Sequence, residues 1–179
     1  MKIDGMEREF IVIGENVHTT RVLLKRSKRV TTDDGGGDVI TYTSHQGEAG
    51  SGETRALPIP DVITASQDFQ EGRVKHVKAA LHQGMFGAAD AAREGLQYIQ
   101  AIVARQEATG ADYLDINVDE VSMRTEEQIE AMHWLTGKVQ EAASRPLAID
   151  SSDTSVIAAA LAAYAGRNGP PMPNSASTE

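Results

Sequence analysis

The sequence contains no cysteine, which excludes disulfides, thiolate metal sites and cysteine nucleophiles. Aromatic residues make up only 4% of the chain, so a core must be built from Ala, Val, Ile and Leu. The formal net charge of −9 argues against a nucleic-acid partner, because neutralising phosphates requires a basic surface. No apolar run approaches the roughly 18 residues of a membrane span, and the acidic N-terminus is unlike a signal peptide. We therefore expect a soluble, cytoplasmic protein without nucleic-acid or membrane partners.

Metal-binding spacings are also missing. The five histidines show neither an H-x-x-x-H nor an H-E-x-x-H pattern. No G-x-x-x-x-G-K-[ST] phosphate loop is present, and the glycines at 35–37 are typical of a turn. We predict no metal site from these patterns.

What the sequence does contain is an alternation of short apolar runs and amphipathic helical patterns. The run at 10–13 ends at Gly14 and is typical of a strand buried on both faces. Thr125 and Gln128 form a capping-box pattern, and Thr154 or Ser155 is expected to cap a later helix. The predicted strands are 10–13, 113–118, 147–150 and 172–175, and the predicted helices are 85–110, 125–144 and 154–166. This order predicts an α/β fold with a parallel sheet and right-handed crossovers.

A long insertion separates the first strand from the first predicted helix. It covers about residues 25–75 and contains D-D-G-G-G-D between two β-rich runs, which predicts a hairpin. The glycine-rich stretch 47–53 is interpreted as a flexible loop. We find no domain boundary, so 1–179 is treated as one domain with an insertion. A lid over the site and a docking surface for a partner are two hypotheses for its role, because long loops often serve such ends.

Polar residues gather where two predicted strands end. They are Asp115, Asn117, Asp119, Glu120, Asp150 and Asp153. A carboxylate accepts two adjacent N–H donors and an amide both donates and accepts, as a 2-amino-pyrimidinone edge requires. The same groups could also coordinate a hard cation such as Mg²⁺. A purely structural alternative is that they cap the helices that follow the strands. In (β/α) barrels such strand ends form the mouth of the active site.

Several motifs resemble the pterin-binding methyltransferases. They are I-V-I-G-E-N-V-H-T-T, G-A-D-Y-L-D-I-N-V-D-E, M-H-W-L, P-L-A-I-D-S-S-D-T-S-V-I-A-A-A-L and the terminal M-P-N-S-A-S-T-E. This family includes methyltetrahydrofolate:corrinoid methyltransferases and the folate domain of cobalamin-dependent methionine synthase, and it is related to dihydropteroate synthase. The resemblance implies a TIM barrel, of which this chain would carry about the first four β/α units. It covers residues 8–24 and 84–179, and nothing in 25–75 contributes to it.

The resemblance also implies roles for individual residues. Asp150 would accept hydrogen bonds from N3–H and the 2-amino group of the pterin ring, and Asn174 would bond the ring as well. Asn117 would line the pocket. The other residues that the resemblance places around the pterin are Asp115, Asp119, Glu15 and Asn16. This chain reads G-E-N-V-H where family members often read G-E-R-x-N.

The implied activity is transfer of the N5-methyl group of methyltetrahydrofolate to a reduced corrinoid, carried by a corrinoid protein or cobalamin domain. A dihydropteroate synthase-like enzyme is the alternative within the fold, but N-V-T-P-D-S-F-S-D and a D-I-G-G-E-S-T-like loop are missing. A non-catalytic pterin-binding or assembly module is the alternative outside enzymes.

Chain length bears on which of these applies. A complete barrel takes about 250 residues, whereas the fourth predicted strand is the last element here. We expect a fragment that is inactive alone, and the other interpretations are a half-barrel completed by another chain, as in a homodimer, or a reduced protein without catalysis.

Overall fold

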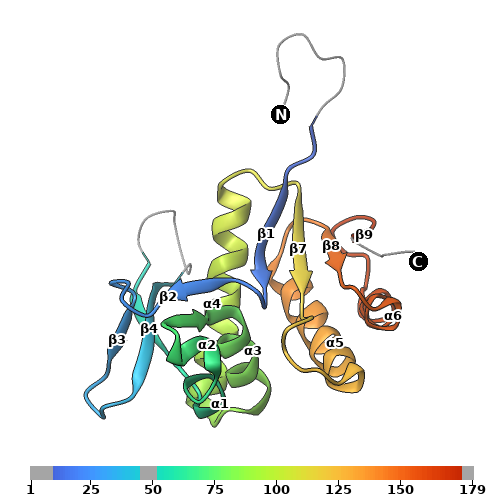
Figure 1. Cartoon of the computed structure of the whole chain (residues 1–179). Helices are drawn as coiled ribbons and strands as arrows, with labels where there is room; N and C mark the ends of the chain where they lie inside the picture. Colours follow the sequence, from blue (N-terminus) through green and yellow to red (C-terminus); the bar gives the residue numbers. More distant parts are fainter. Residues whose placement is uncertain (1–9, 45–51, 175–179) are drawn as a thin grey trace.

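The computed structural model describes residues 10–44 and 52–174, and its centre is a four-stranded parallel sheet (Figure 1). The strand order is β1-β7-β8-β9. The bounds are β1 Ile13–His18, β7 Tyr113–Asn117, β8 Leu147–Asp150 and β9 Met172–Asn174. Over the described residues the sheet is open, so the structure is an α/β fold compatible with part of a TIM-like barrel, and no closed barrel is formed.

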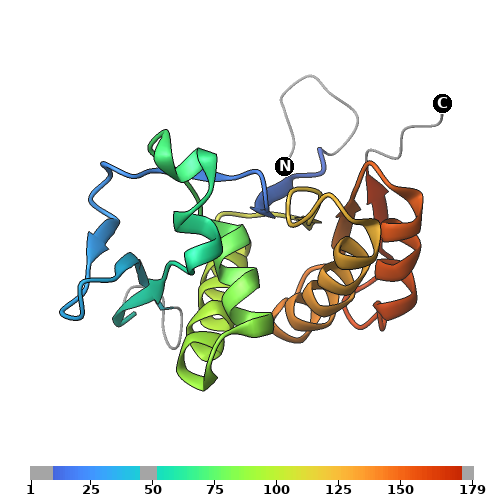
Figure 2. The ribbon, with the colours of Figure 1, turned by 60° about the horizontal axis from the view of Figure 1, so that its bottom comes forward.

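Helices cover the sheet. Their bounds are α3 His76–Phe86, α4 Ala89–Ala108, α5 Thr125–Ala142 and α6 Thr154–Ala163. The first three lie on the same side of β1 and β7 (Figure 2). Leu114 and Ile116 of β7 are fully buried in the core that these helices share. The two later predicted helices are confirmed, and the first corresponds to α4, which begins at Ala89 rather than Met85. The helix α3, which ends just before Gly87, was not predicted.

The helical periodicity of α4 and α5 produces their buried stripes. In α4 the buried residues are Gly95, Tyr98, Ile99, Ile102, Val103 and Gln106. In α5, Met132, Leu135 and Val139 are fully buried, as their spacing of three and four residues requires. Gly110 follows α4 with a φ of 92°, a left-handed conformation in which glycine carries no steric cost, and it ends the helix as predicted.

The first strand differs from its prediction. It begins at Ile13 rather than Phe10, and the side chains of Phe10 and Ile11 are exposed. The pairing of β1 with β7 shifts between Gly14 and Val17. Gln106 Oε1 accepts the Asn16 backbone N–H at 2.9 Å, so this amide is satisfied by a helix side chain instead of a neighbouring strand. Most of the apolar run 10–13 therefore precedes the strand. The strand itself extends through the polar residues Glu15, Asn16 and His18.

Two predicted helix caps are also wrong. Thr125 is the first residue of α5, and its hydroxyl donates to Asp153 Oδ2 at 3.1 Å instead of capping its own helix. Gln128 Nε2 donates to the backbone carbonyls of Asp119 and Ser122, so it ties the preceding loop to α5. Asp153 caps α6 by accepting the Ser155 N–H at 2.8 Å. Both residues of the capping-box pattern, Thr125 and Gln128, thus bond to neighbouring loops instead of capping α5.

The insertion is folded, and its two ends are paired. β2 (Val22–Leu24) runs antiparallel to β6 (Arg73–Lys75). Between them lie β3 Val30–Thr32, β4 Asp38–Thr43, β5 Thr54–Pro58, α1 Asp61–Thr64 and α2 Gln67–Gln70. The predicted hairpin is confirmed as β3–β4, and the first three strands of that set form one antiparallel sheet. Most of the predicted loop 47–53 lies outside the described residues.

The insertion packs beside α4, at the opposite side of the molecule from β8 and β9 (Figures 1 and 2). Glu94 of α4 pairs with Arg55 and accepts a hydrogen bond from Tyr42 Oη at 2.9 Å. Arg29 donates to Tyr98 Oη at 2.9 Å. These buried polar contacts fix the three-stranded sheet against the helix layer. Among the described residues, no helix is long and apolar enough to cross a membrane.

Candidate functional site

Strand register brings the polar strand ends together. His18 is the register partner of Asn117 across β1 and β7, and Asp150 is the partner of Asn174 across β8 and β9. Side chains alternate between the faces of a strand, so residues two apart, such as Asp115 and Asn117, share a face. Because parallel strands end at the same edge, these five side chains form one polar group on one face of the sheet.

Asp150 is at the centre of this group. Its Oδ2 accepts the Asn117 Nδ2–H at 2.9 Å and lies 3.1 Å from His18 Nε2. The side chain of Asp150 is 14% exposed. Within the described part of the chain, hydrogen bonds reach only Oδ2, which leaves Oδ1 as an accessible acceptor.

Asp115 and Asn174 form a second pair beside the first. Asn174 Nδ2 donates to Asp115 Oδ1 at 3.0 Å. Asp115 is buried, and this burial raises the pKa of its carboxyl to about 6. The hydrogen bond from Asn174 opposes that rise, whereas the negative charge of Asp150 adds to it. The site therefore holds two carboxyl groups in unlike environments.

Asp119 lies in the loop after β7 and braces the loop after β8. Its carboxylate accepts from Ser151 Oγ at 2.6 Å and from the Ser152 N–H at 2.9 Å. Its own backbone N–H donates to Asn117 Oδ1 at 2.9 Å. Asp119 thus ties the loop after β7 to the segment that follows Asp150, and both of its carboxylate oxygens are already occupied.

Glu15 and Asn16 lie apart from this group. Both are exposed, and Glu15 Oε2 pairs with Arg21 at 2.9 Å. The charge of Glu15 still contributes to the raised pKa of Asp115. Asn16 meets the rest of the protein through its backbone N–H on Gln106. The pterin-binding roles predicted for these two residues stay predictions.

Sequence reasoning missed His18. The signal was available, because in G-E-N-V-H the histidine occupies the fifth position, where the family pattern G-E-R-x-N carries asparagine. Thr20 Oγ1 lies 2.7 Å from His18 Nδ1, and the Thr20 backbone N–H points to the same atom at 3.4 Å. Since a backbone N–H only donates, Nδ1 is the acceptor and Nε2–H faces Asp150.

The same cluster offers ligands to a cation. One atom each of His18, Asp115 and Asp150 lies within 4.8 Å of the others, a spacing that could hold a metal ion. However, Asn117 and Asn174 each direct an amide N–H at one of the carboxylates. Amide donors pointing into a site favour a ligand with its own hydrogen-bonding edge over a bare cation.

Fold and site together define a class of protein in which a parallel α/β sheet presents carboxylates and amides at the carboxyl ends of its strands. The sequence pattern of the pterin binding enzymes matches residues 87–177, about half of the chain, and the protein belongs to that family. The match spans β7, β8 and β9, and so includes Asp115, Asn117, Asp150 and Asn174. Searches of curated proteins and of solved structures give no match.

Proposed function

We propose that this chain is the pterin-binding part of a methyltetrahydrofolate:corrinoid methyltransferase. The observation that carries the proposal is the open Oδ1 of Asp150, beside the amide of Asn174 and at the carboxyl edge of the sheet. Membership of the pterin binding enzymes supports the ligand class, and the finer assignment rests on the motifs around the strand ends.

The carboxylate of Asp150 has the capacity that a pterin edge requires. A carboxylate offers about four acceptor positions, and His18 and Asn117 occupy two of them. The remaining positions suit the N3–H and 2-amino group of the ring, which are adjacent donors. Asn174 keeps an amide oxygen and one N–H for the ring after donating to Asp115.

The segments at the carboxyl ends of β1 and β7 favour the methyltransferase branch over a dihydropteroate synthase-like enzyme. The D-I-N-V-D-E segment that begins in β7 follows the methyltransferase pattern, whereas G-E-N-V-H in β1 keeps its Gly-Glu pair but departs from it at Asn16 and His18. The motifs that distinguish dihydropteroate synthases at these two places are absent from the sequence.

Methyl transfer from N5 requires a better leaving group, which hydrogen bonding or protonation at N5 in the transition state provides. The acceptor would be a reduced cobalt corrinoid on another protein, which supplies the nucleophile. The residues of this chain bind and orient the pterin, so their contribution to the rate is positional and electrostatic.

Equilibrium binding of 5-methyltetrahydrofolate by calorimetry tests the proposal. Asp150→Asn removes hydrogen bonds to a charged group, each worth about 1.5–3 kcal/mol, so the Kd should rise about 10- to 150-fold. Asp90→Asn, on the exposed first turn of α4, is the matched control and should bind normally. An unchanged Kd in Asp150→Asn would sink the pterin assignment.

Two further measurements separate the alternatives. Methylation of cob(I)alamin by methyltetrahydrofolate, followed by absorbance, distinguishes a transferase from a binding module. Tighter binding of a dihydropterin pyrophosphate than of methyltetrahydrofolate would favour the dihydropteroate synthase-like alternative. Both assays use the unmodified protein, so a single check that the sample is folded serves both of them.

A further inference from the structure

Asn117 is almost completely buried behind Asp150. The whole residue is 2% exposed, whereas the side chain of Asp150 beside it is 14% exposed. Asn117 Nδ2 donates to Asp150 Oδ2 at 2.9 Å, and Asn117 Oδ1 accepts the backbone N–H of Asp119 at 2.9 Å. A ligand at the carboxyl edge of the sheet can therefore reach Asp150, but it has little access to the amide of Asn117.

The backbone of the next loop fixes which end of the Asn117 amide faces Asp150. The two ends of an amide are alike in shape, but one donates hydrogen bonds and the other accepts them. The backbone N–H of Asp119 can only donate, so the atom that faces it must be the amide oxygen. Turning the amide over would place one N–H against another and the amide oxygen against the carboxylate. Asn117 therefore presents a donor to Asp150.

Thr19 adds a second contact to the same amide oxygen. This residue directly follows β1 and is fully buried. Its backbone N–H donates to the Asn117 carbonyl oxygen at 3.1 Å. Its Oγ1 accepts the Glu120 N–H at 3.2 Å, and its hydroxyl hydrogen donates to Asn117 Oδ1 at 3.4 Å. One hydroxyl group thus ties the end of β1 to the Asn117 side chain and to the loop after β7.

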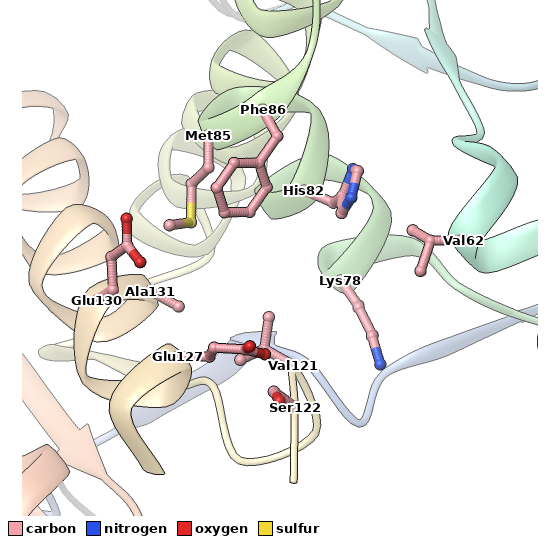
Figure 3. A pocket seen from close by; sticks show the side chains of 10 residues that line it. All are labelled: Val62, Lys78, His82, Met85, Phe86, Val121, Ser122, Glu127, Glu130 and Ala131. Atoms are coloured by element: carbon pink, nitrogen blue, oxygen red, sulfur yellow. The ribbon is translucent and has the colours of Figure 1, made fainter. Parts of the chain in front are cut away.

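The loop after β7 needs such contacts to stay in place. Val121 and Ser122 of this loop line a cavity of about 320 Å³ between α3 and α5, which leaves that side of the loop incompletely packed (Figure 3). On the side of β1, the loop is held by the hydrogen bond from the Glu120 N–H to Thr19. This bond helps to keep the neighbouring N–H of Asp119 directed at the Asn117 amide.

We infer that Asn117 and Thr19 are positioning residues for Asp150, and that the Asn117 amide acts through this carboxylate without contacting the pterin. Thr19 and the Asp119 N–H direct the amide, and the amide holds Oδ2 of Asp150. Oδ1 of Asp150 then stays turned towards the ligand. This inference rests on the proposed binding of a pterin at Asp150, and it gives Asn117 a different role from a residue that lines the pocket.

A double-mutant cycle tests whether Asn117 acts through Asp150. Binding of 5-methyltetrahydrofolate is measured by calorimetry for the wild type, Asn117→Ala, Asp150→Ala and the double variant. In the wild-type background, Asn117→Ala should raise the Kd about tenfold, because it removes a hydrogen bond to the Asp150 carboxylate. In the Asp150→Ala background the same change should alter the Kd by less than about twofold, since no carboxylate is left to hold. An amide that bonded the pterin itself would cost the same factor in both backgrounds.

Variants of Thr19 separate the effect of its hydroxyl from that of its methyl group. Thr19→Val keeps the shape of the side chain but removes the hydroxyl, so the Kd should rise about threefold. Thr19→Ser keeps the hydroxyl and loses the methyl group, so its Kd should stay within about twofold of the wild type. A residue that only packs would give the reverse order. Thr136→Val is the matched control and should bind normally, because Thr136 is fully buried and its hydroxyl has no hydrogen-bond partner among the described residues.

The outcomes separate this inference from the proposed function. A wild-type chain that does not bind methyltetrahydrofolate, or an Asp150→Ala change without effect, overturns both. Normal binding by the wild type, with equal losses from Asn117→Ala in the two backgrounds or no loss in either, overturns the positioning role alone. Weaker binding by Thr19→Ser than by Thr19→Val also overturns it, and this comparison decides the matter even if Asn117→Ala does not fold.

Discussion

The imidazole Nε2 of His18 lies 3.1 Å from Oδ2 of Asp150, although 132 positions separate the two residues in the chain. β1 and β8 are not neighbours in the sheet, because β7 runs between them. Asn117 of β7 donates to the same oxygen at 2.9 Å. One carboxylate oxygen thus joins three strands at their carboxyl ends, and the carboxylate is held in a fixed orientation.

His18 is therefore expected to act as a positioning residue for Asp150. His18→Ala removes one hydrogen bond to the carboxylate, worth about 0.5–1.5 kcal/mol, and should weaken methyltetrahydrofolate binding about 2- to 13-fold. His18→Gln keeps an N–H donor and should recover most of the affinity. Calorimetric titration of the three proteins measures the difference, and equal losses in both variants would contradict an orienting role.

Asp115 should make stability depend on pH. Its pKa is raised from 3.8 to about 6, so the folded state binds its proton more tightly than the unfolded state does. Stability from this group is complete below pH 3.8 and is lost as pH rises through 6, by at most about 3 kcal/mol. Asp115→Asn should remove that loss, so the stability of the variant relative to the wild type should increase as the pH rises from about 4 to about 7. Urea unfolding at several pH values tests this, and a difference that is constant with pH would refute it.

Gly95 marks the closest approach of α3 and α4. A Cβ at this position would lie 2.4 Å from the Ala80 carbonyl oxygen and 2.6 Å from the Gly84 nitrogen, both of which are backbone atoms. Gly95→Ala must push the helices apart and should destabilise the protein by about 1–3 kcal/mol in chemical denaturation. Gly137→Ala in α5 is the control, because apart from its chain neighbours and the nearby backbone of its own helix, nothing lies within 4 Å of a Cβ at this position. There the better helix propensity should leave stability unchanged or raise it by up to about 1 kcal/mol.

Glu94 should anchor the insertion to α4. Its side chain is 14% exposed and meets Arg55 and Tyr42, and these contacts lower its pKa against the opposing effect of burial. Glu94→Gln removes the charged acceptor of the hydrogen bonds from Arg55 and Tyr42 and should lower the free energy of unfolding by about 2–3 kcal/mol. Glu53→Gln removes the exposed partner of the same arginine and should cost less than about 0.5 kcal/mol. Similar losses in both variants would show that Glu94 has no special role.

Prediction from the sequence succeeded where the pattern is local. The stripes of α4 and α5 and the β3–β4 hairpin follow from residues close together in the chain. The capping box at Thr125 failed because its hydroxyl has a partner in Asp153, on a loop that only folding brings near. The start of β1 failed for the same kind of reason, since the Val12 N–H, just before the strand, donates to the side chain of Asp112, which is 100 residues away in the chain.

The sequence by itself determined the alternation of strands and helices and the placing of carboxylates and amides at strand ends, because apolar periodicity and residue type are local properties. Only the tertiary structure decided which of these groups meet. Register across parallel strands places His18 beside Asn117 and Asp150 beside Asn174, while Glu15 and Asn16 remain outside at the irregular part of β1. A single-residue change of register turns a side chain to the other face of a sheet, so no count along the chain alone could fix that choice.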